Sequence, residues 1–123
     1  MGAALAEAGS EVWLVSRNRA HVDAIRARGL EVRTDDGERT VRVDAAVDCA
    51  GLAPVDLLIV LVKSLDTRKA IEAAMPAIGE HTIVMSLQNG LGHEEVLGAV
   101  VGRERLIAGR TYVGGQLLAP GIV

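Results

Sequence analysis

Three short apolar runs stand out along the chain, at residues 12–15, 57–62 and 83–87. None of them alternates apolar with polar positions. A run of this kind is typical of a strand that is buried on both faces, as the strands of a parallel sheet are. The pattern therefore predicts three parallel strands, each buried on both faces.

The segments around these runs carry apolar residues at helical spacing. The spacing predicts helices over residues 3–8, 21–28, 66–78 and 94–101. Gly9 and Gly29 follow the first two of these segments, at positions where glycine commonly ends a helix. Strands that alternate with helices favour a doubly wound α/β sheet.

One segment departs from this rhythm. Residues 30–33 and 40–43 alternate apolar and polar positions around Asp35-Asp36-Gly37, which predicts an antiparallel hairpin at one edge of the sheet. We interpret the two adjacent carboxylates as turn residues rather than as a catalytic pair. The last part of the chain, residues 106–108 and 111–123, is predicted to be extended, with breaks at its Gly-Gly and Pro-Gly pairs.

Composition narrows the classes of function. Half of the residues are apolar and 24% are charged, so the chain can bury a core. Thirteen basic and sixteen acidic side chains give a net charge of −3, and a single Trp and a single Tyr offer few surfaces for stacking bases. We therefore expect no nucleic-acid partner. The apolar runs are too short to cross a membrane and no signal peptide is recognisable, so we expect no membrane contact and a cytoplasmic location.

The cysteine and histidine residues indicate neither a disulfide, a nucleophile nor a metal site. The single cysteine, Cys49, excludes an internal disulfide, and we interpret it as a small buried side chain rather than a nucleophile. His21, His81 and His93 are scattered without metal-ligand spacing, so no metal site is predicted. The chain has neither the nucleophile elbow of a hydrolase nor a P-loop.

Polar residues follow the first strand, at the edge where open α/β sheets bind their ligands. Arg17 stands there, within Ser16-Arg17-Asn18-Arg19. A basic residue at this point suits the 2′-phosphate of NADP, whereas an acidic residue suits the ribose of NAD. The alternative is a solvated loop in which Asn18 caps the next helix.

The second and third strands end in a lysine and an amide. Lys63 closes the longest apolar run, where its ammonium group can meet a cofactor hydroxyl or an anionic substrate; alternatively, its stem carries the charge out into solvent. Asn89 follows the third strand within Gln88-Asn89-Gly90-Leu91-Gly92. Asn-Gly ordinarily signals a hairpin, but a predicted helix follows, which favours a turn whose backbone N–H groups and Asn89 side chain bind a ligand.

Taken in order along the chain, these strand ends resemble the ketopantoate reductase (2-dehydropantoate 2-reductase) family. The resemblance is carried by AEAGSEVWLVSR, AHVDAIRARGL, DLLIVLVKS, SLQNGLGHEEVL and GRERLIAGRTYVGG, and so runs through nearly the whole chain. It implies a Rossmann-like, mainly parallel sheet that binds NADPH. It also implies hydride transfer to the keto carbon of 2-dehydropantoate, which gives pantoate for pantothenate and coenzyme A biosynthesis.

The resemblance assigns roles to individual residues. Arg17 matches the residue that holds the 2′-phosphate. Lys63 matches the lysine beside the nicotinamide ribose and the substrate, and Asn89 matches the amide that contacts cofactor and substrate. Gly115 falls where a backbone contact to the cofactor is expected.

Two features of the family are expected to lie outside the chain. AALAEAGSEV matches the later part of the family's first helix, so the first strand and its GxGxxG loop would precede Met1. We accordingly interpret Gly2 as a helix glycine that packs on the sheet. The helical carboxyl-terminal domain, with its general-acid lysine and substrate-binding glutamate, is also expected to be missing. Residues 1–123 are therefore predicted to be a partial NADP-binding domain that is inactive alone.

Two other interpretations remain open. One is a non-catalytic dinucleotide-binding or interaction module, whose exposed sheet edge would associate with another chain or in a homodimer. The other is a reductase of the same family that acts on a different 2-keto acid. This interpretation and that of a ketopantoate reductase both imply a small-molecule 2-keto acid as substrate.

Overall fold

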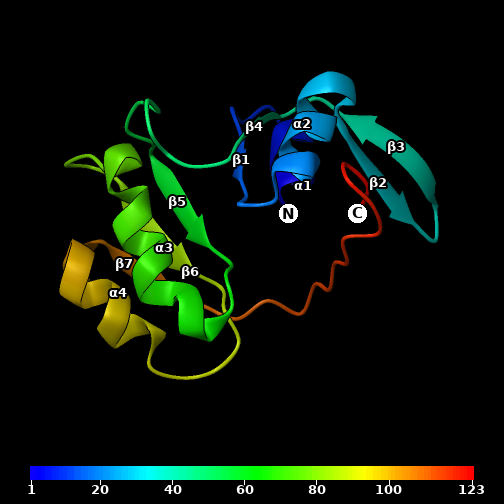
Figure 1. Cartoon of the computed structure of the whole chain (residues 1–123). Coiled ribbons are helices and arrows are strands. Elements are labelled where there is room, and N and C mark those ends of the chain that lie inside the picture. The colour runs from blue at the N-terminus through cyan, green and yellow to red at the C-terminus, as the bar shows by residue number, and fades with distance from the viewer. The chain divides into compact units, whose positions relative to one another are not determined.

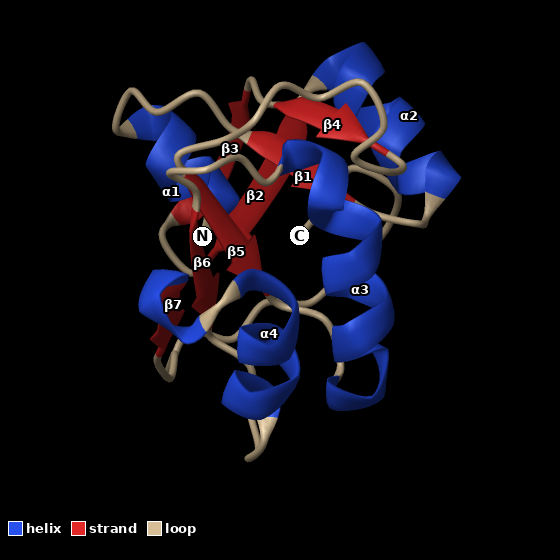
Figure 2. Cartoon of the chain, turned by 90° about the vertical axis from the view of Figure 1, so that its left-hand side faces the viewer, coloured by secondary structure: helices blue, strands red, loops and turns tan.

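The computed structural model describes all residues from Met1 to Val123, and the chain divides into two units. Unit 1 comprises Met1–Asp48 and Gly114–Val123, and unit 2 comprises Cys49–Val113. Each unit combines helices with strands, as Figures 1 and 2 show. None of the helices reaches the length and apolarity needed to cross a bilayer.

Unit 1 is built from two helices and four strands. They are α1 (Gly2–Glu7), β1 (Trp13–Val15), α2 (Arg19–Arg28), β2 (Leu30–Thr34), β3 (Gly37–Val41) and β4 (Asp44–Ala46). Strands β1 and β4 pair in parallel, and β2 and β3 form the predicted antiparallel hairpin. Their apolar residues and those of the two helices share one core, which includes Ala3, Val22, Ile25, Leu30, Val41 and Ala45.

Local sequence signals explain the helix boundaries of unit 1. Asn18 caps α2, since its Oδ1 accepts a hydrogen bond from the backbone N–H of His21 at 3.1 Å. Gly29 ends the helix at a φ of 86°, a conformation that residues with a Cβ rarely adopt. Gly2 packs on the sheet as predicted, because a Cβ built on it would lie 2.5 Å from Leu14 Cδ2.

The end of the chain adds to the hairpin of unit 1. The backbone N–H of Glu31 donates to Gly121 O, and the N–H of Arg33 donates to Val123 O, both at 2.8 Å. The N–H of Val123 donates back to Glu31 O at 2.9 Å. The chain is therefore extended here and turns at its Pro-Gly pair, as predicted.

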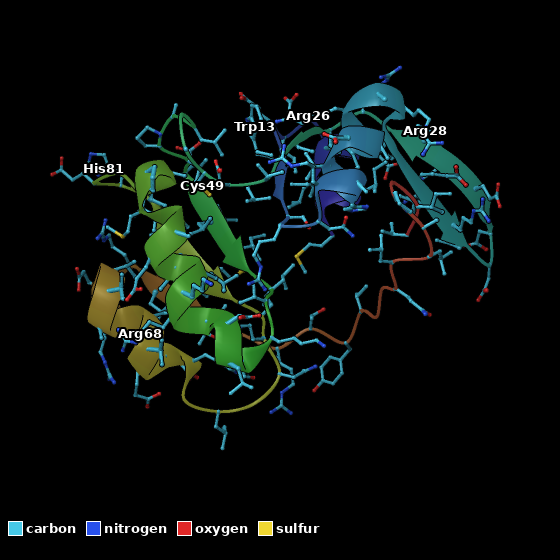
Figure 3. All side chains as sticks on the ribbon, in the orientation of Figure 1. Trp13, Arg26, Arg28, Cys49, Arg68 and His81 are labelled. Atoms are coloured by element: carbon cyan, nitrogen blue, oxygen red, sulfur yellow. The ribbon has the colours of Figure 1, made fainter.

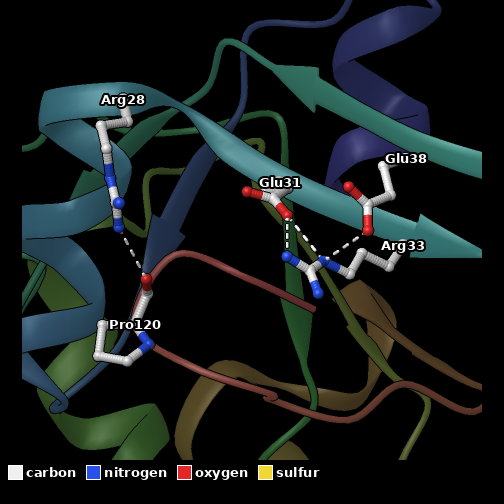
Figure 4. Close-up of polar contacts among 5 residues, drawn as sticks. All are labelled: Arg28, Glu31, Arg33, Glu38 and Pro120. Atoms are coloured by element: carbon white, nitrogen blue, oxygen red, sulfur yellow. Dashed lines mark hydrogen bonds and ion pairs between the residues drawn. The ribbon is translucent and has the colours of Figure 1, made fainter.

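Charged side chains surround this added segment, and Figure 4 shows their contacts. Arg28 Nη2 donates to Pro120 O at 3.2 Å. The guanidinium of Arg33 forms ion pairs with Glu31 and Glu38. These ion pairs are exposed, so they contribute little to stability compared with the backbone pairing.

Unit 2 is a three-stranded parallel sheet covered by helices. Its strands are β5 (Leu57–Val60), β6 (Ile83–Ser86) and β7 (Leu106–Ala108), its α-helices are α3 (Thr67–Ala74) and α4 (His93–Val101), and its 3₁₀ turns are η1 (Ser64–Asp66), η2 (Met75–Ala77) and η3 (Arg103–Arg105). The strand order is β5-β6-β7, all parallel. Helices α3 and α4 pack on the sheet through Val60, Ile71, Val84, Leu97 and Val101. The predicted helix over residues 66–78 is interrupted near Pro76, whose ring nitrogen cannot donate a helical hydrogen bond.

Cys49 behaves as a small core residue, as predicted. It is buried, forms no disulfide and packs with Ala74 and Ala77 at the end of α3, where Figure 3 labels it. The cysteine therefore belongs to the core of unit 2 and not to a reactive site.

Some expectations need correction. Strand β4 was not predicted, and the hairpin forms its own two-stranded sheet instead of an edge of the parallel one. The expectation that each apolar run is buried on both faces is wrong for β1 and β5, because Trp13 is 39% exposed and Leu57 is 41% exposed. The physical reason is that only one face of each strand packs on the core of its unit. Leu14 of β1, and Leu58 and Val60 of β5, contact those cores. Trp13, Val15 and Leu57 lie on the opposite faces.

Candidate functional site

The four predicted site residues divide between the two units. Arg17 and Gly115 belong to unit 1, and Lys63 and Asn89 belong to unit 2. Arg17, Lys63 and Asn89 are exposed, and each lies within three residues of the carboxyl end of a parallel strand. Ligands of open α/β sheets bind at such ends.

In unit 1, the turn between β1 and α2 holds Arg17. Ser16 Oγ accepts a hydrogen bond from the backbone N–H of Asn18 at 3.3 Å, and Asn18 in turn caps the helix. The predicted capping role of Asn18 is thus confirmed. It is compatible with a phosphate role for Arg17, because the cap and the guanidinium use different atoms.

The same turn suits an anion. Arg17 and Arg19 are both exposed, and the turn itself contains no carboxylate. The amino end of α2, which carries a partial positive charge, begins directly after Asn18. Guanidinium groups present several donors to phosphate oxygens, so this set of residues fits the 2′-phosphate of NADP.

Gly115 lies in an exposed stretch of unit 1 without helix or strand. A Cβ built on this residue would meet no atom within 4 Å. Packing therefore does not require glycine here, and the backbone contact expected at Gly115 stays a prediction.

In unit 2, the structure brings the segments of Lys63 and Asn89 together. They follow β5 and β6, which are neighbours in the sheet. Ser64 Oγ donates a hydrogen bond to Asn89 O at 3.3 Å, and His93 Nε2 lies 2.9 Å from the same oxygen. An ammonium group and a side-chain amide are therefore presented from two segments that are hydrogen-bonded to each other.

The turn after Asn89 leads into a helix and not into a hairpin, as predicted. Gly90 and Gly92 have φ values of 108° and 84°, in the region that favours glycine. Helix α4 then begins at His93 without a side-chain cap. The backbone N–H groups of its first turn have no acceptor within the helix, as in every α-helix, and no capping side chain accepts from them here.

A buried polar network beneath this site was missed by the sequence analysis. Gln88 Nε2 donates to Val62 O at 2.7 Å and to Thr67 Oγ1 at 2.8 Å, and its Oε1 accepts from Ser86 Oγ at 3.1 Å. Thr67 Oγ1 donates to Ser64 O at 2.9 Å. The two-residue period of β6 was the available signal, since it puts Ser86 and Gln88 on the same buried face.

Comparison with known protein families gives a match over the full chain. Residues 1–123 match the family described as ketopantoate reductase PanE/ApbA. The 2-dehydropantoate 2-reductases of Pyrococcus horikoshii and Halobacterium salinarum are 37% and 35% identical to the chain, and the matches cover 100% of it but only 39% and 41% of those proteins. The chain thus spans about two fifths of the length of these relatives.

Solved structures agree with this match. A PanE/ApbA family ketopantoate reductase from Ralstonia eutropha has a TM-score of 0.88 at 35% identity, over 98% of this chain and 40% of that one. D-mandelate dehydrogenase, solved with NADH and anilino(oxo)acetate, has a TM-score of 0.92 at 28% identity, over 98% of this chain and 39% of that one. These likenesses confirm the predicted Rossmann-like, mainly parallel α/β fold.

Proposed function

The chain belongs to the ketopantoate reductase PanE/ApbA family, and from this membership we propose that residues 1–123 form the NADPH-binding part of an enzyme that reduces 2-dehydropantoate to pantoate. The observation that carries the proposal is the juxtaposition of the Lys63 and Asn89 segments at the ends of adjacent parallel strands. The proposal assigns the protein to pantothenate and coenzyme A biosynthesis in the cytoplasm.

In this proposal Lys63 and Asn89 position the substrate. Bound NADPH supplies a hydride to the keto carbon of the substrate. The ammonium group of Lys63 donates to the substrate oxygen on which negative charge develops, and so stabilises that charge. The Asn89 side chain both donates and accepts, which suits simultaneous contact with a ribose hydroxyl and the substrate. The proton that completes the new hydroxyl group comes from a general acid outside residues 1–123, so these residues alone turn over no substrate.

Arg17 and Gly115 hold the cofactor in the same proposal. The Arg17 guanidinium binds the 2′-phosphate and thereby favours NADPH over NADH. The support for this role is its exposed position beside the amino end of α2. Gly115 offers its backbone to the cofactor, in an exposed stretch where a Cβ built on it would meet no atom within 4 Å.

A second candidate is a reductase of this family that uses NADH and another 2-keto acid. The similarity to D-mandelate dehydrogenase, which was solved with NADH, favours it. Asp48 also bears on this choice, because it comes two residues after β4, the strand that pairs in parallel with β1. A carboxylate at that edge suits the ribose hydroxyls of NAD.

Calorimetric titration of the chain with NADPH and with NADH tests the proposal, with circular dichroism as a check that the chain is folded. We expect NADPH to bind at least about tenfold more tightly, since an arginine–phosphate contact contributes more than a neutral hydrogen bond. Tighter binding of NADH would favour the second candidate. A folded chain that binds neither cofactor would instead indicate a non-catalytic interaction module, for which the exposed edge of β1 is the expected contact surface.

A further inference from the structure

Gln88 does more than fill a buried position beside the site. We propose that it is a positioning residue: its side-chain amide replaces a main-chain donor between β5 and β6, and so leaves the backbone N–H of Asn89 available to a ligand oxygen. This inference rests on the proposed function of the Lys63–Asn89 site and adds to it both a residue and a hydrogen-bond donor.

The hydrogen bonds between the two strands show the replacement. The last main-chain bond runs from Leu87 N–H to Val60 O at 3.3 Å. Bonds of a parallel ladder recur every two residues, so the next one would join Asn89 N–H to Val62 O. Gln88 Nε2 occupies that acceptor instead, at 2.7 Å. The Asn89 N–H makes no hydrogen bond within the chain.

The same amide fixes the backbone on both sides of Lys63. Gln88 holds the carbonyl of Val62 directly. Its second N–H donates to Thr67 Oγ1, and this hydroxyl donates to the carbonyl of Ser64. Both N–H groups of a nearly buried amide are therefore used, which defines its orientation. The relay holds the carbonyl groups of the residues before and after Lys63.

Alternation along the extended chain explains how one short segment serves two purposes. Gln88 is buried, and the next residue, Asn89, is exposed. The first side chain anchors the segment inward while the second faces outward with an unpaired backbone N–H beside it. The Asn89 side-chain amide, the Asn89 backbone N–H and the Lys63 ammonium group together form a set of donors that suits a carbonyl or carboxylate oxygen of a ligand.

Substitutions that remove the relay test this role. Val62 O loses its donor in Gln88→Leu. Gln88→Met, which has a longer side chain, removes the same donor and serves if leucine disturbs the core. We expect the Asn89 N–H to take its place, so that hydrogen exchange of the Asn89 amide slows at least about tenfold. We expect NADPH to bind about tenfold more weakly. Thr67→Val should weaken NADPH binding similarly. Thr67→Ser, which keeps the hydroxyl group, should bind NADPH as tightly as the wild-type chain does.

Thr82→Val provides the matched control. Thr82 is also a buried threonine of unit 2, but its hydroxyl accepts from Gly79 N–H and donates to Val55 O before the start of β6, at the end of the strand away from the site. This variant should lose stability without any change in Asn89 exchange or NADPH affinity. If the role of Gln88 were purely structural, its variants would behave like Thr82→Val: they would lose stability without any change in Asn89 exchange or NADPH affinity.

The inference would be overturned if hydrogen exchange of the Asn89 amide were unchanged in the Gln88 variants. It would also be overturned if exchange slowed but the variants bound NADPH as tightly as the wild-type chain does. A wild-type chain that binds neither nicotinamide cofactor would contradict the proposed function. Hydrogen exchange of the Asn89 amide is measured without ligand. Even if the wild-type chain binds neither cofactor, this measurement therefore decides whether Gln88 keeps the Asn89 N–H from bonding to Val62 O.

Discussion

Arg17 and Lys63 are both exposed cations just past a strand, but their surroundings differ. In the turn around Arg17, Ser16 Oγ accepts from Asn18 N–H, Asn18 caps α2, and the backbone N–H of Ser16 donates to Ala46 O. The backbone around Lys63 is held by a buried amide that comes from another strand. These bonds use atoms of Ser16, Asn18 and Ala46, so we infer that they persist when the side chain of Arg17 is replaced, whereas the backbone around Lys63 depends on the side chain of Gln88.

This difference makes Arg17 a good site for a charge reversal. Arg17→Glu should weaken NADPH binding by about tenfold or more and change NADH binding much less, because a carboxylate repels the 2′-phosphate that only NADPH carries. Calorimetry with both cofactors measures the two affinities. Arg42→Glu changes the net charge equally, at an exposed residue of unit 1 before the start of β4, and should leave both affinities unchanged. Equal weakening of NADPH and NADH by Arg17→Glu would remove Arg17 from the 2′-phosphate site.

At the scale of elements, the docking of the chain's last residues on β2 depends on a histidine. His21 Nδ1 accepts a hydrogen bond from the backbone N–H of Gly121 at 2.9 Å. Partial burial lowers the pKa of His21 below its usual value. Since a protonated ring nitrogen cannot accept this bond, protonation of His21 opposes docking.

The direction of the pH effect follows from this shift. The pKa of His21 is lower in the folded than in the unfolded chain, so the unfolded chain binds the proton first as the pH falls below about 6.5. The stabilisation is therefore fully present above that pH and is lost as the pH falls through the folded pKa. We expect the amide of Val123, which donates to Glu31 O, to lose protection from hydrogen exchange between pH 7.5 and pH 5 after correction for intrinsic rates. His21→Gln should abolish this pH dependence, and its persistence in the variant would contradict the assignment.

The elements also show where sequence reasoning reaches its limit. The runs that became β5 and β6 and the caps of α2 could be predicted, because their signals are local and consist of continuous apolar residues, Asn18 and Gly29. Strand β4 was missed since Asp44–Ala46 is short and its alanines carry little hydrophobic signal. The exposed candidate residues Lys63 and Asn89 could be identified from the sequence as polar residues after apolar runs. Their support by Gln88 could not, because its bonds to Val62 and Thr67 span 26 and 21 residues along the chain.

At the scale of the whole molecule, each unit has a core of its own. The core of unit 1 combines residues of both its helices with residues of β2, β3 and β4. The main core of unit 2 joins α3 and α4 to β5 and β6, and a smaller cluster surrounds Cys49. No buried residue of one unit belongs to a core cluster of the other. Two separate cores favour two unfolding transitions over a single cooperative one.

Core truncations can separate the two transitions, because Trp13, the only tryptophan, reports on unit 1. Leu97 is fully buried in unit 2, so Leu97→Ala should destabilise that unit by roughly 2–5 kcal/mol. We expect it to lower the denaturant midpoint for loss of amide protection in α3 and α4 and to leave the Trp13 fluorescence midpoint unchanged. Ile25→Ala, at a buried position of unit 1, should do the reverse. If either substitution shifted both midpoints equally, the units would unfold as one, and cofactor binding to either of them would then stabilise the whole chain.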